Sequence, residues 1–220
     1  KFIDGTIDAS GLLAFPVNRT IVGESIGTFY GYDWAGLNAN GENTYYKISN
    51  GQRSGSHVTA DQITSSDRKV LGKSSPDVTL AWNNQITWKN FDLNFFFTGS
   101  FGAKKLNLVR YTMASMVGDS RFITLRDAYF KGYDKVGAGA EYPSLSKNYK
   151  ALAESNQWLE KADYVRLENI TLGYNISKSV TKFADLRIYA SAQNLFTLTG
   201  YKGMDPASST FSSNGSLDVN

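Results

Sequence analysis

The chain of 220 residues is long enough for one or two domains, and it contains no cysteine, which excludes disulfides, cysteine-ligated metal sites and a cysteine nucleophile within it. A net charge of +3, with basic residues that never run beyond pairs, does not indicate a nucleic-acid partner. The 13 Tyr, 13 Phe, 4 Trp and 20 Gly occur together with a negative mean hydropathy, which is typical of strands with one polar and one apolar face.

The first third of the chain gives weak secondary-structure signals. Residues 1–15 contain a candidate strand that ends before Pro16. Residues 20–31 predict one strand loosened by glycines. Residues 32–76 have the composition of a long loop, with a short strand over residues 44–48.

The clearest strands flank a two-residue turn at Lys89–Asn90. Residues 77–88 and 91–101 alternate between apolar and polar side chains, which indicates strands with two different faces. One face carries Val78, Leu80, Trp82, Ile86, Trp88, Phe91, Leu93, Phe95, Phe97 and Phe101. Asn84 and Phe96 break the pattern. We expect this apolar face to contact lipid.

The remaining chain repeats this arrangement after a long connection. Residues 102–162 contain two helical patterns, one through Leu106, Val109, Met113, Met116 and Val117, and one over residues 120–131 that Asp119 can cap. Residues 163–176 and 186–198 then predict two more alternating strands, joined by a shorter turn over residues 177–185.

Long and short connections alternate along the chain, which places every long loop at one end of an antiparallel meander. Transmembrane β-barrels have this asymmetry, with short periplasmic turns and long extracellular loops. The predicted strands of about 11 to 14 residues exceed the usual length of about 5 to 6 and suffice to cross a bilayer. Aromatic residues near segment ends fit girdles at the two membrane interfaces: Tyr30, Tyr32, Trp88, Phe91, Phe101, Tyr164 and Tyr174.

Four sequence blocks resemble the C-terminal part of SusC/RagA-type TonB-linked outer-membrane proteins, in the same order and spacing. They are GESIGTFYGYDWAGL (23–37), DRKVLGKSSPDVTLAWNNQITWKNFDLNFFFTGSFG (67–102), WLEKADYVRLENITLGYNI (158–176) and LRIYASAQNLFTLTGYKGMDP (186–206). The resemblance implies an all-β fold, a partial transmembrane antiparallel β-barrel. It would hold five or six long strands of a barrel of about 22, with long extracellular loops that carry short helices.

The resemblance also implies a function and partners. Residues 1–220 would be the C-terminal segment of a TonB-dependent receptor barrel, without the plug domain, the TonB box and the closing strand. The whole protein would import glycan oligomers, or peptides, across the outer membrane of a Bacteroidota bacterium. A SusD-like surface lipoprotein would close over residues 32–76 and 102–162, and the TonB complex would supply energy through the N-terminal region.

The residues do not favour an enzyme, a cofactor site or a metal site. The single histidine, His57, lies in a Gly/Ser loop with no carboxylate beside it in sequence. A glycosidase would need two carboxylates that flank a substrate bond. The loop carboxylates are Asp61, Asp67, Asp119, Asp134 and Glu141, and we interpret them as solvated charges.

Two sets of residues are candidates for contact with cargo. Aromatic rings stack on sugar faces, and the loops carry Trp34, Tyr45, Tyr46 and Trp158; the alternative is that these rings pack within the loops or anchor a girdle. The polar face of the strands carries Asn83, Gln85, Asn94, Arg187 and Gln193, which we expect to face the barrel lumen. They would line the cargo path or hydrate the interior against a plug.

Two other functions stay open on the sequence. A soluble β-sandwich could bind glycan as a free-standing module, and it would cover the apolar strand faces with a second sheet. A glycosidase fragment would depend on a loop carboxylate.

Overall fold

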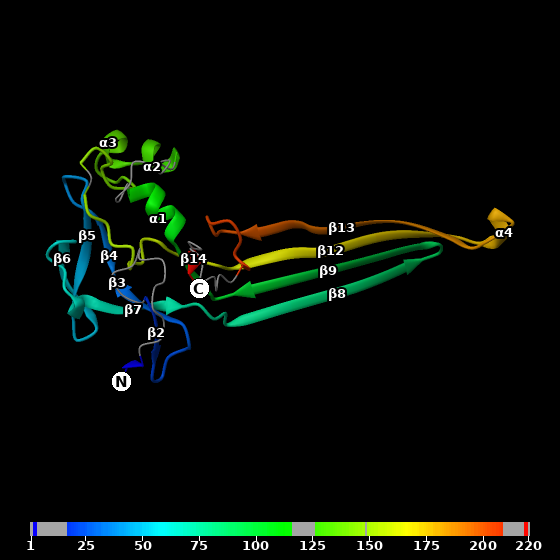
Figure 1. Ribbon diagram of the computed structural model, residues 1–220, viewed down its shortest axis with the longest axis horizontal. Coiled ribbons are helices and arrows are strands. Elements are labelled where there is room, and N and C mark those ends of the chain that lie inside the picture. Colours follow the sequence, from blue (N-terminus) through cyan, green and yellow to red (C-terminus); the bar gives the residue numbers. More distant parts are fainter. Residues whose placement is uncertain (1, 4–16, 116–125, 148, 209–217, 220) are drawn as a thin grey trace. The chain divides into compact units, whose positions relative to one another are not determined.

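The computed structural model describes residues 2–3, 17–115, 126–147, 149–208 and 218–219. The chain divides into two compact units (Figure 1). The sheet unit comprises residues 76–103 and 162–201, and the loop unit comprises residues 1–75, 104–161 and 202–220. Among the described residues, no helix has the length and apolar character needed to cross a membrane.

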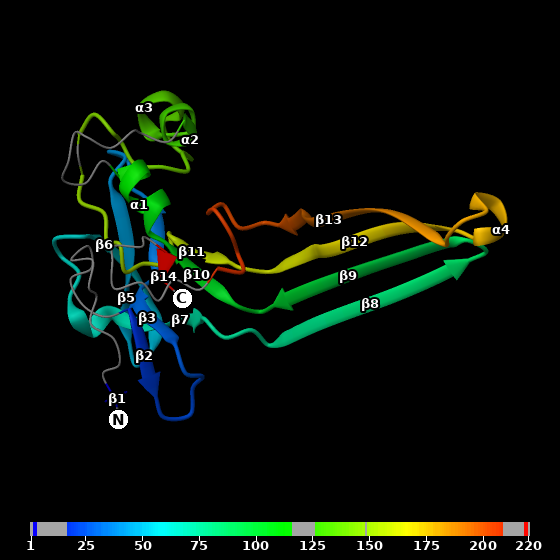
Figure 2. The same ribbon diagram turned by 45° about the vertical axis from the view of Figure 1, so that its right-hand side comes forward.

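Four long antiparallel strands form the sheet unit (Figure 2). They lie in the order β13-β12-β9-β8, with bounds β8 (Val78–Trp88), β9 (Phe91–Phe101), β12 (Tyr164–Ile176) and β13 (Leu186–Thr199). Lys89 adopts a positive φ of 53°, which allows the predicted two-residue turn at Lys89–Asn90. The predicted strand lengths are confirmed, since these strands run from 11 to 14 residues.

The apolar residues of the four strands form one continuous face. Trp82 lies opposite Phe97, and Trp88 lies opposite Phe91, so both pairs are on the same side of the sheet. The face continues across β12 and β13 through the rows Phe95–Ile170–Ala192, Leu93–Leu172–Ala190 and Phe91–Tyr174–Ile188. The predicted alternation is confirmed, and Asn84 is the polar exception within this face.

This apolar face is not sealed. Trp82 and Trp88 remain 57% and 64% exposed, and Leu80 remains 59% exposed. A β-sandwich would bury such residues against the inner face of a second sheet. The soluble β-sandwich alternative is therefore wrong for this sheet, and the partial barrel describes the fold.

The connections sort by length as predicted. Phe91 at the start of β9 pairs with Tyr174 near the end of β12. The turn at Lys89–Asn90 and the connection over residues 177–185 consequently lie at the same end of the sheet (Figure 1). That second connection contains the short helix α4 (Lys178–Thr181). The long connection between β9 and β12 leaves and enters at the opposite end.

The described part of the loop unit contains three small antiparallel sheets and short helices. The sheets contain β1 (Phe2–Ile3), β2 (Asn18–Ile21), β3 (Thr28–Tyr32) and β7 (Arg68–Lys73); β4 (Trp34–Leu37), β5 (Asn43–Ser49) and β6 (Gln52–Thr59); and β10 (Lys104–Asn107), β11 (Leu159–Lys161) and β14 (Asp218–Val219). The helices are α1 (Leu108–Ser115), α2 (Arg126–Phe130), α3 (Tyr133–Val136) and a 3-10 turn over Ser65–Asp67.

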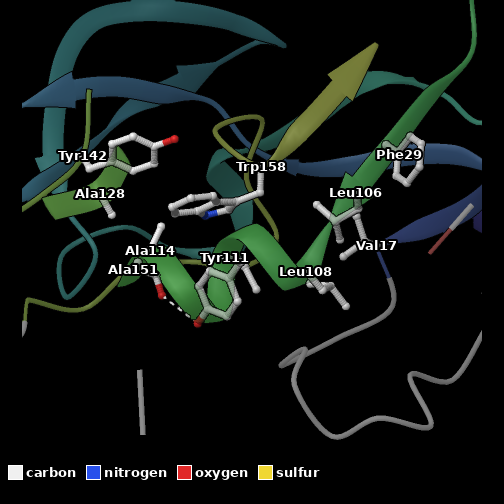
Figure 3. Packing of buried hydrophobic residues seen from close by; sticks show 11 residues of the cluster. Val17, Phe29, Leu106, Leu108, Tyr111, Ala114, Ala128, Tyr142, Ala151 and Trp158 are labelled. Carbon is white, nitrogen blue, oxygen red and sulfur yellow. Dashed lines mark hydrogen bonds between the residues drawn. The ribbon is translucent and has the colours of Figure 1, made fainter. Parts of the chain in front are cut away.

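Trp158 occupies the centre of the main core of the loop unit (Figure 3). Its indole ring is fully buried and lies edge-on to Tyr111 of α1, with ring centroids 5.6 Å apart. Its Nε1–H donates to the carbonyl oxygen of Leu152 at 3.1 Å, so the one polar atom of the ring is satisfied. The other buried members of this core are Val17, Phe29, Leu106, Leu108, Ala114, Ala128, Tyr142, Ala151 and Ala153.

Several predicted elements of the first half are wrong. Residues 20–31 form β2, a turn and β3 instead of one strand, because Gly23 and Gly27 take positive φ values of 91° and 77°. Residues 32–76 are not a long loop but contain β4 to β7, although the predicted strand at residues 44–48 is confirmed within β5.

The helical connection differs in its boundaries. α1 begins at Leu108, because the Asn107 side-chain oxygen accepts a hydrogen bond from the Arg110 backbone N–H at 2.9 Å and caps the helix. Leu106 belongs to β10 instead. Met116, Val117, the proposed cap Asp119 and residues 4–16 lie outside the described residues. Four strands of the expected length are described, where we expected five or six.

Of the aromatic residues expected to form girdles, one group is found together. The rings of Trp88 and Phe91 are stacked 6.4 Å apart, and those of Phe91 and Tyr174 lie 4.6 Å apart, at the end of the sheet with the short turns. Tyr32 is instead buried in the second core of the loop unit, and Tyr164 pairs with Ser100 on the polar face.

The buried carboxylate of Asp67 joins two segments of the loop unit. It accepts hydrogen bonds from the Thr64 backbone N–H at 2.9 Å and the Thr64 hydroxyl at 2.8 Å, from Lys47 Nζ at 3.1 Å and from the Ile48 N–H at 3.2 Å. Burial by itself would raise its pKa, but these bonds outweigh burial and lower the pKa from 3.8 to about 2.

We predict that Asp67→Asn destabilises the loop unit by about 2 kcal/mol at neutral pH. Because the folded-state pKa is depressed, this stability is present above the usual carboxyl value and is lost as pH falls toward about 2. Hydrogen exchange of the backbone at Thr64 and Ile48, in the intact protein in detergent, measures the effect. Equal exchange in the parent and the variant at neutral pH would contradict it.

Candidate functional site

The five residues predicted to face the lumen share one face of the sheet unit. Register places Asn83, Phe96, Asn169 and Gln193 in one row across the four strands, and Gln85, Asn94, Thr171 and Ser191 in the next. Arg187 lies two rows further on, opposite Asn175. The sheet therefore collects amide, hydroxyl and charged side chains on the face opposite the aromatic residues. That this face borders a lumen stays a prediction.

A charged cluster marks this polar face near the short turns. Arg187 Nη2 contacts Asp92 Oδ2 at 2.5 Å, and Arg187 Nε donates to Asp92 Oδ1 at 3.3 Å, which is a two-point contact. Asn175 Nδ2 donates to the same Asp92 Oδ1 at 3.1 Å. Gly173 lies beside Asp92, and a Cβ atom there would fall 2.5 Å and 2.6 Å from the two carboxylate oxygens. The glycine thus provides the space in which the carboxylate reaches Arg187.

A β-bulge adds a second carboxylate to the polar face. The register between β9 and β12 shifts between Leu167 and Asn169, which leaves Glu168 without a partner residue on β9. The Thr98 hydroxyl donates to Glu168 Oε1 at 2.6 Å. We did not predict Glu168 as a polar-face residue, because strict alternation places it with the apolar side chains. Its neighbours in sequence carry no signal for the bulge.

Two of the four predicted ligand-binding aromatics are structural. Tyr45 and Trp158 are fully buried, in the two separate cores of the loop unit. The Tyr45 hydroxyl accepts a hydrogen bond from the Leu152 N–H at 2.9 Å, while Trp158 donates to the carbonyl oxygen of the same residue. A ring that is buried on both faces offers no surface to a ligand, so we correct both assignments to core packing.

Trp34 and Tyr46 are half-buried, and the structure does not join them into one platform. Trp34 pairs with Tyr45 across β4 and β5, which places the adjacent Tyr46 on the other face of that small sheet. Trp34 Nε1 donates to Asn43 Oδ1 at 3.0 Å. The Arg53 guanidinium lies 4.2 Å from the centre of the Tyr46 ring. Both rings stay predictions as ligand contacts.

Asp33 organises the strands that carry these rings. Its buried carboxylate accepts hydrogen bonds from Arg53 Nε at 2.7 Å and Nη2 at 3.0 Å, and from Asn156 Nδ2 at 2.8 Å; Lys69 Nζ lies 3.4 Å away. Burial raises the pKa of Asp33, but the hydrogen bonds from Arg53 and Asn156 and the charges of Lys69 and Arg53 prevail and lower it. Asp33 is therefore ionised at neutral pH.

We expected the loop carboxylates to be solvated charges, but several of them contact other side chains or backbone groups. Asp134 accepts hydrogen bonds from the Ser144 hydroxyl at 2.6 Å and from the Ser146 N–H at 2.9 Å. Glu141 lies 3.2 Å from Lys202 Nζ and 3.5 Å from Arg110 Nη2. Asp67 is buried, whereas Asp61 is exposed and lies 3.5 Å from Lys150. These contacts connect separate loop segments, and Asp119 lies outside the described residues.

Comparison with known proteins identifies the group to which this arrangement belongs. The chain is 32% identical over 195 residues to a TonB-dependent receptor of Formosa agariphila, covering 84% of this chain and 19% of that receptor. It is 30% identical over 148 residues to the TonB-dependent receptor SusC of Bacteroides thetaiotaomicron, covering 66% of this chain and 14% of SusC. The chain thus spans about a fifth or less of these relatives. No family model matches it.

Solved structures show the same fold. A structure of the RagAB peptide transporter superposes with a TM-score of 0.69 and 24% identity, over 82% of this chain and 20% of that chain. The RagAB peptide importer in a closed state gives a TM-score of 0.68 over 83% of this chain and 21% of that chain.

The chain belongs to the SusC/RagA family of TonB-dependent receptors. This SusC/RagA-type chain is accordingly part of an outer-membrane protein of the Bacteroidota. Its four long strands are barrel strands.

We predict that Gly173→Ala breaks the two-point contact of Asp92 with Arg187, because the added methyl group would occupy the place of the carboxylate. A structure of the full receptor carrying this change should show the carboxylate displaced beyond hydrogen-bond distance of Arg187. Gly200→Ala is the matched control, since a Cβ atom there has nothing within 4 Å. An unchanged contact in the Gly173 variant would contradict the role given to this glycine.

Proposed function

We propose that this chain forms part of the wall and extracellular loops of an active importer, which takes up a nutrient oligomer across the outer membrane. The observation that carries the proposal is the two-faced sheet, with an unsealed aromatic face on one side and rows of amide, hydroxyl and charged groups on the other. A closed barrel places such a polar face around a hydrated lumen. The similarity to TonB-dependent receptors supports the same role.

The chain contributes structure and surface to transport, not covalent chemistry. The loop carboxylates that could serve a hydrolase are engaged with lysine, arginine and serine partners from other segments. His57 is exposed on β6 and lies edge-on to the Tyr46 ring, with ring centroids 6.0 Å apart. We therefore propose a non-enzymatic role, in which conformational change exposes a binding cavity first to one side of the membrane and then to the other.

The partners we propose follow from the similarity. A SusD-like surface lipoprotein would close over the loop unit, and the TonB complex would act through a part of the receptor outside these 220 residues. The cargo would be a glycan oligomer or a peptide; the solved structures of similar fold are of a peptide importer. Trp34 and Tyr46 are the aromatic residues of the predicted set whose rings are partly exposed, so we propose them as the cargo contacts of the loop unit.

Growth of the native bacterium tests the import role. Deleting the receptor gene should abolish growth on one cargo class, oligosaccharide or peptide, supplied as the sole source of carbon, and leave growth on monosaccharides and amino acids unchanged. Normal growth on every oligomer would contradict the proposal.

Replacement of the exposed rings tests the proposed cargo contacts. We predict that Tyr46→Ala or Trp34→Ala lowers uptake of labelled cargo by at least about five-fold, because an aromatic contact in a binding site contributes about 1 kcal/mol or more. The amount of receptor at the surface should stay the same. Tyr129→Ala is the matched control, as Tyr129 is an exposed tyrosine of α2 that the proposal does not include. Uptake equal to that of the control would show that neither ring contacts the cargo.

A further inference from the structure

The β12–β13 hairpin projects beyond its neighbours at the end of the sheet with the short turns. β8 and β9 end at the Trp88–Phe91 pair, and Phe91 is opposite Tyr174. β12 and β13 continue for two further pairs, Asn175–Arg187 and Ile176–Leu186, before the connection that contains α4. Figure 1 shows α4 beyond the turn between β8 and β9. The chain therefore extends past the aromatic group of Trp88, Phe91 and Tyr174.

The projecting connection carries apolar side chains that are largely exposed. Val180 and Phe183 are each 71% exposed. A short turn that merely reverses the chain in water has no need for such residues, and Asn, Asp, Gly and Ser are its usual components. Two large apolar side chains at a projecting tip indicate a non-aqueous environment or a partner.

Lysines lie close in sequence to these apolar residues. Lys178 and Lys182 lie in the α4 connection, and Lys89 lies in the adjacent turn with its Nζ 5.0 Å from the centre of the Trp88 ring. The one acidic residue of the connection, Asp185, accepts a hydrogen bond from the Lys178 backbone N–H at 2.6 Å. The nearby Asp92 is already engaged by Arg187 on the polar face. The tip thus presents a net positive charge next to exposed apolar groups.

We propose that this tip, made of Lys89, Lys178, Val180, Lys182 and Phe183, is an anchor that seats in the headgroup region of an anionic phospholipid leaflet. Apolar side chains together with lysines are the composition of membrane-interface segments, because the rings and branched chains enter the acyl boundary while ammonium groups contact phosphate. The tip is continuous with the apolar sheet face and lies just past its aromatic group, where headgroups begin. Since short barrel turns are periplasmic, the leaflet is the inner one.

The anchor would fix the depth and tilt of these four strands in the membrane. The apolar face by itself sets a band of hydrocarbon contact, but it tolerates sliding along the membrane normal. Basic and aromatic groups in the headgroup region resist that movement, because sliding along the membrane normal would take them out of the interface.

A fluorescence measurement tests the anchor in the full-length receptor that contains this chain. Phe183→Cys is labelled with an environment-sensitive fluorophore in a background without other cysteines, and the receptor is inserted in phosphatidylethanolamine vesicles with and without phosphatidylglycerol. The label should be quenched by lipids that carry a nitroxide near the headgroup, and more strongly with phosphatidylglycerol. Met204→Cys is the control, because Met204 is 93% exposed and lies outside the sheet unit.

Lipid enrichment tests the lysines. Lys178→Gln and Lys182→Gln should each lower the enrichment of phosphatidylglycerol around the receptor by about five-fold, since a lysine near an anionic surface contributes about 1 kcal/mol. Lys161→Gln, a change of an exposed lysine of β11, should leave it unchanged.

Three results would overturn the proposal. The first is that an aqueous quencher reaches the label at position 183 as readily as the label at position 204. The second is that the label at position 183 is protected from the aqueous quencher but is not quenched by lipid, which would indicate a protein partner. The third is unchanged phosphatidylglycerol enrichment in both lysine variants.

Discussion

The constraint on which this structure depends is that a sheet with two unlike faces needs two unlike solvents. The aromatic face of the sheet unit extends over four strands, and its apolar side chains on the edge strands β8 and β13 stay largely exposed. Within the sheet the backbone N–H and C=O groups pair with neighbouring strands, as a hydrocarbon environment requires, because unpaired groups there cost several kcal/mol each. The two edge strands, β8 and β13, need partners for the same reason, and a closed barrel provides them.

The polar face shows how such a wall stays ordered without a packed core behind it. Its side chains satisfy one another across strands: Asp92 with Arg187 and Asn175, Glu168 with Thr98, and Thr171 with Ser191. The glycine beside Asp92 and the bulge at Glu168 are local departures from a regular strand, and each one positions a carboxylate. In the loop unit, by contrast, buried rings and buried carboxylates fix the segments, so that the long connections are folded structures and not free loops.

The sequence predicted the sheet unit well because the alternation of side chains is itself the physical signal of a two-faced strand. Trp82, Ile86 and Phe97 could be assigned to one face before the register was known, and the two-residue turn at Lys89–Asn90 fixed one pairing. The loop unit could not be predicted in the same way. Its strands are short, their faces contact different cores, and Tyr45 and Trp158 gave the same signal whether buried or exposed. The bulge at Glu168 left no local trace, since it depends on the pairing of two strands far apart in sequence.

The most direct test of the account is to measure which solvent each face of β8 contacts in the full receptor in a bilayer. Spin labels at Leu80 and Ile86 report on the aromatic face, and labels at Asn83 and Gln85 report on the polar face. Molecular oxygen, which concentrates in lipid, should relax the first pair, and a water-soluble nickel chelate should relax the second. Labels at Leu80 and Ile86 that are protected from both reagents would show that protein covers the aromatic face, and would contradict the account.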